Sequence, residues 1–262
     1  MKHLRIALRF LTRYPVRDQE IFNPGDFGRS TGYYPLVGFF AGLDLMILRW
    51  LTLLDKNSLH APLWAFMILL FWIWSSDSLH LDGLADTADA LASRRIGRDF
   101  LAVLHDSRVG AFGAAAMGMA ILAKFVWLSS LPMENCWFLP LPLIFSRLHA
   151  SLACQIRPYA GNSGSLSSLF ICESRYADFN RAVAWSVISF FCLAVPSLYF
   201  GFTTAEEAAE ALAVCLAGLI LGWSILKLPM RRLGGISGDL IGWSQMICEI
   251  VIAFGLSIVL VH

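Results

Sequence analysis

The sequence predicts an all-α integral membrane protein, built as a bundle of about seven transmembrane helices. Of its 262 residues, 57% are hydrophobic and only 15% are charged, and the mean hydropathy is +0.64. Soluble domains carry roughly 25% charged residues. Several apolar runs approach the ~20 residues that a helix needs to cross a bilayer. Composition and run length therefore both indicate a polytopic helical protein.

The predicted spans follow one another along the whole chain. They cover residues 33–54, 62–81, 110–131, 137–154, 182–201, 207–226 and 240–261. Lys and Arg concentrate in the N-terminal segment and in residues 92–109, 155–181 and 227–239, whereas the alternate connections are short or acidic. Cytoplasmic loops carry the excess of basic residues in membrane proteins. We therefore expect a cytoplasmic N-terminus and an external C-terminus.

The segment before the first span differs from the spans in its pattern of residues. Arginine recurs every four positions within residues 3–17, and leucines fill much of the remaining surface (Arg5, Arg9, Arg13 and Arg17). This pattern predicts an amphipathic helix on an anionic leaflet, with an ordinary cytosolic helix as the alternative. Residues 18–32 read as a polar loop. Residues 1–32 and the bundle of residues 33–262 form a single predicted domain, because no internal repeat appears.

Charge and cysteine content exclude several classes of function. The net charge of +1 gives no general signal for a polyanion, so no nucleic-acid partner is expected. The six cysteines are scattered without any C-x-x-C pair, which indicates apolar packing residues rather than disulfides or a zinc site. The N-terminus also lacks the features of a cleavable signal peptide.

The most informative stretch is the decapeptide His80–Asp89, HLDGLADTAD. Its carboxylates Asp82, Asp86 and Asp89 fall within roughly 60° of one another on a helix. Like charges at that spacing repel, and a bound divalent cation reverses the sign of the interaction. Oxygen ligands alone suit Mg²⁺ or Mn²⁺, with substrate phosphates in the open positions. A solvated acidic helix end is the alternative, but the apolar neighbours favour a metal site.

Other motifs are expected on the same, cytoplasmic side. Arg108 could clamp a phosphate near the start of the third span, although an anchoring arginine is common there. Glycines in two motifs would let a substrate or a helix approach closely (Gly110, Gly113, Gly234, Gly235 and Gly238). Asp239 could complete a metal shell begun by Asp82. A glycine turn with an N-capping Asp239 is the alternative.

A few polar residues remain at or within the predicted spans. Arg147, Arg157 and Tyr159 surround the cytoplasmic end of the fourth span and are candidate phosphate or nucleotide contacts, with anchoring as the alternative. Asp44 and Glu249 fall inside spans, where a carboxylate is either functional or a hydrogen-bonded structural acid.

Taken together, the motifs resemble the cobalamin synthase family, the adenosylcobinamide-GDP ribazoletransferases of the last stage of vitamin B12 assembly. The segments that carry the resemblance run along essentially the whole chain: FLTRYPV at 10–16, YYPLVG at 33–38, HLDGLADTAD at 80–89, DSRVGAFG at 106–113, RPYA at 157–160, and Gly234-Gly235 followed by Gly238-Asp239 and Gly242. Two positions depart from the family pattern. Residues 161–165 lack an expected basic residue, and Ala90 stands where glycine is common.

The resemblance implies a multi-pass enzyme of the cell inner membrane, dependent on Mg²⁺ and active on the cytoplasmic side. It would transfer the adenosylcobinamide phosphate of adenosylcobinamide-GDP to α-ribazole or α-ribazole 5′-phosphate, releasing GMP. As a hypothesis for the family's chemistry, Asp82, Asp86 and Asp239 hold metal, Asp89 shares the metal or acts as the catalytic base, and Arg108 steadies a phosphate. The lipid bilayer is the only other partner implied, and a homodimer is left open.

Two other functions are alternatives for this sequence. A CDP-alcohol phosphotransferase carries the element Asp-Gly-x-x-Ala-Arg, but after Asp82-Gly83 this chain has Asp86 and Thr87 in the places of that Ala and Arg. A transporter would use Asp44 and Glu249 as a pathway, and no inverted repeat supports one.

Overall fold

The computed structural model describes residues 2–16, 21–52, 61–132 and 135–259, and within these ranges the chain is helical with no β-strand. Six helical segments are long and apolar enough to span a membrane, and a bent pair of helices supplies a seventh candidate. The six are Pro24–Leu51, Ala111–Ser130, Cys136–Ala153, Tyr176–Tyr199, Ala205–Leu233 and Gly238–Val259. The predicted all-α polytopic bundle is confirmed.

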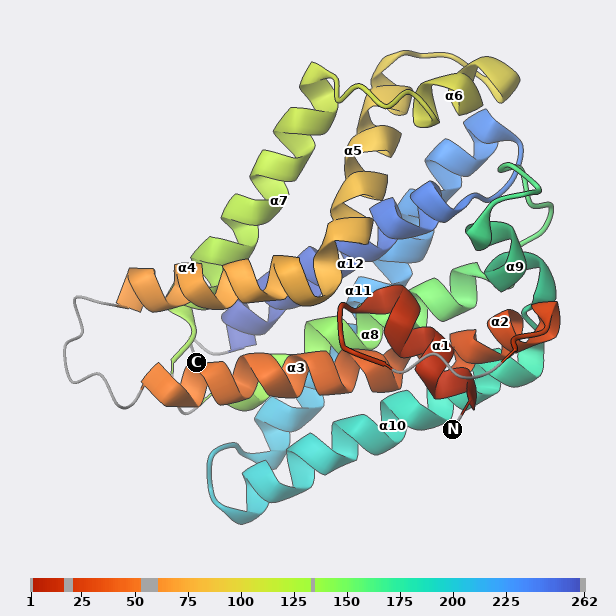
Figure 1. The fold of residues 1–262 in the computed structure, drawn as a ribbon. Helices are drawn as coiled ribbons and strands as arrows, with labels where there is room; N and C mark the ends of the chain where they lie inside the picture. The colour runs from red at the N-terminus through yellow and green to blue at the C-terminus, as the bar shows by residue number, and fades with distance from the viewer. Residues whose placement is uncertain (1, 17–20, 53–60, 133–134, 260–262) are drawn as a thin grey trace.

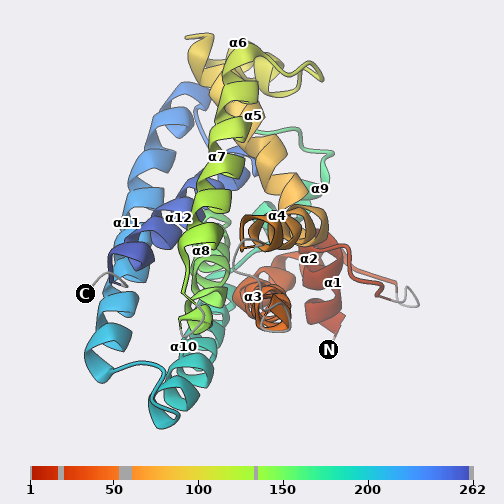
Figure 2. The ribbon, with the colours of Figure 1, turned by 90° about the vertical axis from the view of Figure 1, so that its left-hand side faces the viewer.

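Helix α8 (Pro140–Ala153) forms the centre of the bundle. All of its residues except Leu152 are buried. It packs against α3 (Tyr34–Leu51), α10 (Tyr176–Tyr199), α11 (Ala205–Leu233) and α12 (Gly238–Val259). Figure 2 shows α11 and α12 on one side of α8, and α3 and α4 on the other. Burial on all sides gives this helix the central place in the bundle.

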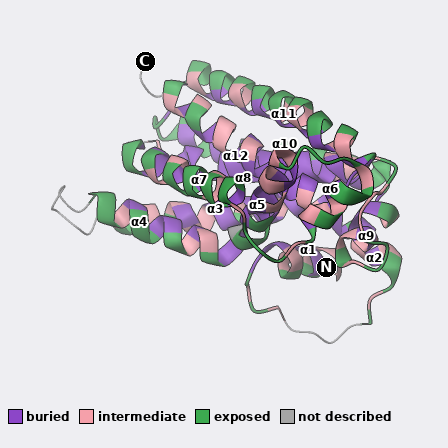
Figure 3. Ribbon diagram, turned by 90° about the horizontal axis from the view of Figure 1, so that it is seen from above, coloured by how far each residue is buried: buried purple, intermediate pink, exposed green. Residues whose placement is uncertain are grey.

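The outer faces of the surrounding helices are apolar as well. Figure 3 shows buried residues gathered along the middle of the molecule and exposed ones on the outer helix faces. Large apolar side chains are among the exposed ones, including Phe66, Met119, Phe191, Ile220, Leu228 and Ile258. Soluble monomers rarely expose contiguous apolar surface of this extent, whereas lipid requires it.

The chain turns sharply within the second predicted span, residues 62–81, which the structure forms as part of a bent pair of helices. Helix α4 (Ala61–Trp72) passes through a π-helical turn, Ile73–Asp77, into α5 (Ser78–Ala92), and the two arms differ in direction by 84°. The carbonyl of Ser75 accepts a 2.8 Å hydrogen bond from the backbone N–H of Arg13. A π-turn explains a kink without proline, because it frees backbone groups for outside partners.

The N-terminal part folds against one end of the bundle. Helix α1 (Lys2–Leu11) is shorter than the predicted helix over residues 3–17, and Arg17 lies outside the described residues. Its buried residues Ile6, Ala7 and Leu11 belong to a core cluster, while Arg5 and Arg9 are exposed. Its contact with a membrane surface stays a prediction.

Residues 18–32 were predicted as a loop, and this is wrong for the part that forms α2 (Pro24–Ser30). Asn23 precedes Pro24 as N-cap, and Asp26 accepts a 2.9 Å hydrogen bond from the Asn23 backbone N–H. Proline at the first helical position and an acid at the third are helix-start signals. Lys2 and His3 of α1 also contact the Asp26 carboxylate.

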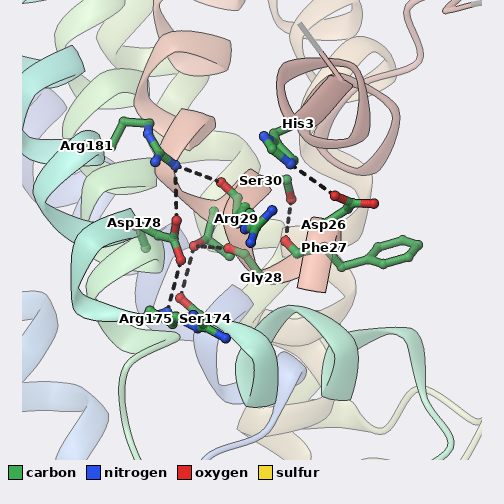
Figure 4. A network of polar contacts seen from close by, with 12 residues as sticks. His3, Asp26, Phe27, Gly28, Arg29, Ser30, Ser174, Arg175, Asp178 and Arg181 are labelled. Atoms are coloured by element: carbon green, nitrogen blue, oxygen red, sulfur yellow. Dashed lines mark hydrogen bonds and ion pairs between the residues drawn. The ribbon is translucent and has the colours of Figure 1, made fainter. Parts of the chain in front are cut away.

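Figure 4 shows how α2 is joined to α9 (Leu166–Glu173) and α10. Arg181 of α10 donates to the carboxylate of Asp178 and to the carbonyl of Arg29 in α2. The Thr31 hydroxyl lies 3.0 Å from that of Ser174, directly after α9. These contacts fix α9 at the same end of the bundle as α1.

The connections between the helices lie at the two ends of the bundle. Figure 1 shows α1, α2, α9 and the α11–α12 turn on the right, and the α10–α11 turn and the C-terminus on the left. The short helix α6 (Gly97–Leu104), which follows α5, contacts α11 and therefore belongs to the right-hand end. We call this the motif end, because it gathers the segments 80–89, 106–113, 157–160 and 234–239.

Candidate active site

The site is built where α5 crosses the first turns of α12. A Cβ atom added to Gly83 of α5 would lie 2.8 Å from the carbonyl oxygen of Asp239 and 3.3 Å from Cα of Gly242. Only glycine allows backbones to come this close. The crossing therefore brings the decapeptide together with Asp239.

Two of the predicted acids share a cavity at this crossing. Asp82 and Asp239 both line a cavity of about 290 Å³. Asp86, one turn further along α5, lies within electrostatic range of Asp82, Asp239 and Asp89. Asp239 also lies within electrostatic range of His105, which follows α6. The structure thus brings the four predicted carboxylates into one neighbourhood.

Asp89 is engaged differently from the other acids. Its carboxylate oxygens accept hydrogen bonds from the backbone N–H groups of Gly110, at 2.7 Å, and Gly113, at 2.9 Å. These N–H groups belong to the open start of α7 (Ala111–Ser130), where a negative charge is stabilised. Added Cβ atoms at these two glycines would lie 2.5 and 2.4 Å from the Asp89 oxygens. The glycines predicted to admit a substrate thus make room for a carboxylate.

Arg108 stands at the exposed rim of the site. It lines a second pocket of about 370 Å³ together with Asp86 and Asp89. Its guanidinium bonds to Asp106 through Nε at 3.0 Å and Nη2 at 2.8 Å. The hydrogen bond from Arg108 lowers the pKa of the Asp106 carboxyl to about 2. An exposed, pre-oriented guanidinium is suited to meeting a phosphate.

Arg147, predicted as a substrate contact, lies elsewhere. Its side chain is fully buried in α8, and Nη1 lies 3.0 Å from Oε2 of Glu249. The other oxygen of Glu249 lies 2.6 Å from Nζ of Lys124, which stacks over the Trp72 ring. Glu249 is therefore paired on both sides in the bundle interior. The structure does not bring Arg147 to the cavity.

Asp44, the other acid within a predicted span, accepts a hydrogen bond from the hydroxyl of Tyr14. Burial and this contact raise the pKa of Tyr14 above its ordinary value. Both intramembrane acids thus have partners, which is the arrangement expected of structural acids.

The Arg157–Tyr159 segment shapes the loop beside the cavity. The Arg157 guanidinium donates to four backbone carbonyls, those of Cys154, Ile156, Cys172 and Ser174. The Tyr159 hydroxyl lies 2.7 Å from that of Ser165 and 3.0 Å from that of Ser167, two residues that line the cavity. Arg157 and Tyr159, both predicted to contact substrate, therefore hold this loop in its conformation in the structure.

The glycines before α12 serve the same loop. Gly234 has a φ of +85° and ends α11 in the left-handed conformation. Gly235 lies against the Pro158 carbonyl, and a β-bridge joins Tyr159 to Ile236. Of the three predicted glycines in this motif, Gly238 lines the cavity.

Several lining residues were missed by sequence reasoning. Phe10, Tyr34, Phe170 and Gln245 all line the cavity. Phe10 and Tyr34 belong to motifs used for the resemblance, yet apolar periodicity gave them no role beyond packing. Phe170 and Gln245 had no signal in a single sequence.

The carboxylates suit a divalent cation, although they are not assembled into a closed cage. Among the described residues, no three His, Cys, Asp or Glu side chains are grouped closely enough to hold a metal. Mg²⁺ is usually bound by one or two carboxylates together with water and substrate phosphates. Asp82 and Asp239 in one cavity, with Asp86 beside them, fit that pattern.

Fold and site together define a polytopic helical membrane protein with a carboxylate-lined cavity at one end of its bundle. Residues 3–257 match the family described as Cobalamin-5-phosphate synthase. The chain belongs to this family.

Curated relatives agree along the whole chain, and each of the following is named adenosylcobinamide-GDP ribazoletransferase. The chain is 31% identical over 254 residues to that of Ralstonia pickettii, covering 95% of this chain and 93% of the relative. It is 31% identical over 260 residues to that of Pseudomonas aeruginosa, covering 98% of both. It is 32% identical over 250 residues to that of Geotalea daltonii, covering 94% and 93%. No solved structure matches the chain.

Proposed function

We propose that this chain transfers the adenosylcobinamide phosphate of adenosylcobinamide-GDP to α-ribazole or its 5′-phosphate, and that it does so where α5 crosses α12. The observation that carries the location is the shared cavity of Asp82 and Asp239, which lie far apart in the sequence. Family membership and the names of the relatives support the reaction.

In this reaction a ribose hydroxyl oxygen forms a bond to the phosphorus attached to cobinamide. The bond from that phosphorus to the GMP oxygen breaks, and GMP leaves with the electron pair. The hydroxyl proton passes to a carboxylate of the site or to water. Catalysis of such a transfer rests on positioning and on neutralising phosphate charge.

Asp82 and Asp239 would hold Mg²⁺ together with substrate phosphates and water, and Asp86 would lie beside the ion. When bound, the ion would neutralise charge on the diphosphate and on the leaving group. The acids of the chain supply oxygen donors only, which is the donor set that Mg²⁺ prefers. Their mutual repulsion also favours a cation between them.

Asp89 and Arg108 would act around this centre. Because both Asp89 oxygens already accept backbone hydrogen bonds, we assign Asp89 a positioning role at the start of α7 rather than the roles of ligand and base. Arg108, two residues before Gly110, would be held at the rim to orient a phosphate. Its bond to Asp106 keeps the guanidinium pre-oriented.

The assay is a transfer reaction on membranes that contain this protein, with adenosylcobinamide-GDP, α-ribazole 5′-phosphate and Mg²⁺. GMP release should require both substrates and stop with EDTA or with Asp82→Asn. Glu206→Gln is a matched control, because Glu206 is an exposed acid at the other end of the bundle. Full activity of well-folded Asp82→Asn would overturn the proposal that Asp82 holds the metal.

A CDP-alcohol phosphotransferase is the second reaction to assay. The same membranes should leave CDP-alcohol donors unreacted, since Asp86 and Thr87 stand where that family has Ala and Arg. Turnover of CDP-alcohols without ribazole transfer would replace the proposed reaction.

A further inference from the structure

One wall of the 290 Å³ cavity is aromatic. The rings of Phe10 and Phe170 stack with centroids 4.1 Å apart, and the Tyr34 ring lies 6.2 Å from each of them. These rings come from three separate helices, α1, α3 and α9. They belong to or pack on one buried hydrophobic cluster. Asp82 and Asp239 line the same cavity from α5 and α12.

Two residues of the lining each carry a buried polar atom without a partner. The Tyr34 hydroxyl and the Gln245 side-chain amide nitrogen are buried with no hydrogen-bond partner among the described residues. Their side chains are only 2% and 1% exposed. Buried polar groups in native proteins are nearly always hydrogen-bonded, so Tyr34 and Gln245, which both line this cavity, are candidate donors to a ligand that supplies acceptors.

The size of the cavity selects among the parts of the proposed substrates. A corrin ring system is far larger than 290 Å³, a volume at the lower end of the roughly 300–1,000 Å³ of small-molecule sites. A nucleoside is of suitable size. Guanine presents several donors and acceptors on its edges, whereas a dimethylbenzimidazole is apolar apart from one ring-nitrogen acceptor.

We propose that this cavity binds the benzimidazole base of α-ribazole, with the rings of Phe10, Tyr34 and Phe170 around the base and the Gln245 amide donating to its ring nitrogen. The Tyr34 hydroxyl is the second donor to the nucleoside. The ribose then lies toward Asp82 and Asp239, where its hydroxyl meets the phosphate. This inference rests on the proposed function and names the acceptor half of that site.

The test uses variants that remove only the unpartnered atoms. Gln245→Met and Tyr34→Phe keep the shape of the side chain and delete a donor that has no partner within the described protein. Each should weaken equilibrium binding of α-ribazole about fivefold to tenfold, the usual effect of one lost neutral hydrogen bond. The KM for adenosylcobinamide-GDP and the melting temperature should both stay at their wild-type values. Tyr33→Phe, at the neighbouring tyrosine that does not line the cavity, is the matched control.

A ligand analogue separates this hydrogen bond from general packing. The dimethylindole riboside carries CH in place of the ring nitrogen, so wild type should bind it about as weakly as Gln245→Met binds α-ribazole. Gln245→Met should bind both ligands alike. Equal loss for both ligands, or an unchanged α-ribazole affinity in both variants, would overturn the assignment.

Binding is measured without the second substrate, so the two proposals fail differently. A protein that performs transfer, but whose variants keep wild-type α-ribazole affinity, retains the proposed function and loses this pocket. A protein that binds guanosine rather than α-ribazole in a Gln245-dependent way assigns the cavity to the leaving group. A protein without transfer activity or α-ribazole binding loses both.

Discussion

Oδ2 of Asp89 accepts a 2.7 Å hydrogen bond from the backbone N–H of Gly110, which ties the end of the acidic decapeptide to the start of α7. The acid that is last in the motif thus fixes one helix against another. The other acids of the site, which line or adjoin the cavity, remain available to bind metal and substrate. Acids on one face of α5 therefore have two different roles, and the sequence alone does not distinguish them.

Asp89→Asn should destabilise the protein even in EDTA. An amide side chain offers one oxygen acceptor, so one of the two backbone N–H groups loses its bond and the other bonds to a neutral group. Hydrogen bonds to charged groups contribute about 1.5–3 kcal/mol. Thermal unfolding in detergent measures the loss. An unchanged melting temperature together with weakened Mg²⁺ binding would restore Asp89 to the metal ligands.

Gly113→Ala should reduce both stability and transfer activity. Its Cβ would lie 2.4 Å from an Asp89 oxygen and 2.9 Å from the carbonyl oxygen of Ala85. Gly118→Ala is the matched control, because a Cβ at that position of the same helix meets nothing within 4 Å. The control should be neutral, or more stable by up to about 1 kcal/mol from helix propensity. Equal behaviour of the two variants in activity and melting temperature would contradict the close contact.

Glu249→Gln should be strongly destabilising. It leaves the cations of Lys124 and Arg147 buried without their counter-charge, and breaking a buried ion pair costs about 3–5 kcal/mol. The readouts are the yield of folded protein and its melting temperature, with Glu206→Gln as the exposed control. A stable, folded Glu249→Gln variant that lost ion flux in vesicles would favour the transporter instead.

The sidedness of the bundle is testable by labelling. Cysteines are introduced at exposed Arg95, at the motif end, and at exposed Glu206, at the other end, after the two exposed native cysteines Cys172 and Cys192 are replaced by Ser. An impermeant maleimide should label position 206 on intact spheroplasts and position 95 only after the membrane is opened. The reverse pattern would place the active site outside the cytoplasm.

Hydropathy and local motifs predict most of the helical frame, because lipid imposes run length on each span. They also place Asp82 and Asp239 together, since both motifs end on the same side. The π-turn at Ile73–Asp77 could not be predicted in this way. It depends on the Ser75 carbonyl meeting the Arg13 backbone, a contact between distant segments.

The same limit applies to the site. Arg147 resembles a phosphate ligand in the sequence, and only the packing of α8 on α12 shows that it forms an ion pair with Glu249. Phe170 and Gln245 acquire a role because α9 and α12 meet at one cavity. Pairwise contacts across the bundle, unlike periodicity, leave no trace in a single sequence.

The small volume of the cavity has a consequence for selectivity. Because the macrocycle of the donor is too large to enter 290 Å³, most of that substrate must stay outside this cavity. The protein would then distinguish its substrates by the diphosphate tail of the donor and by the incoming nucleoside. We therefore expect cobinamides that differ in their peripheral amides or upper axial group to be processed at similar rates.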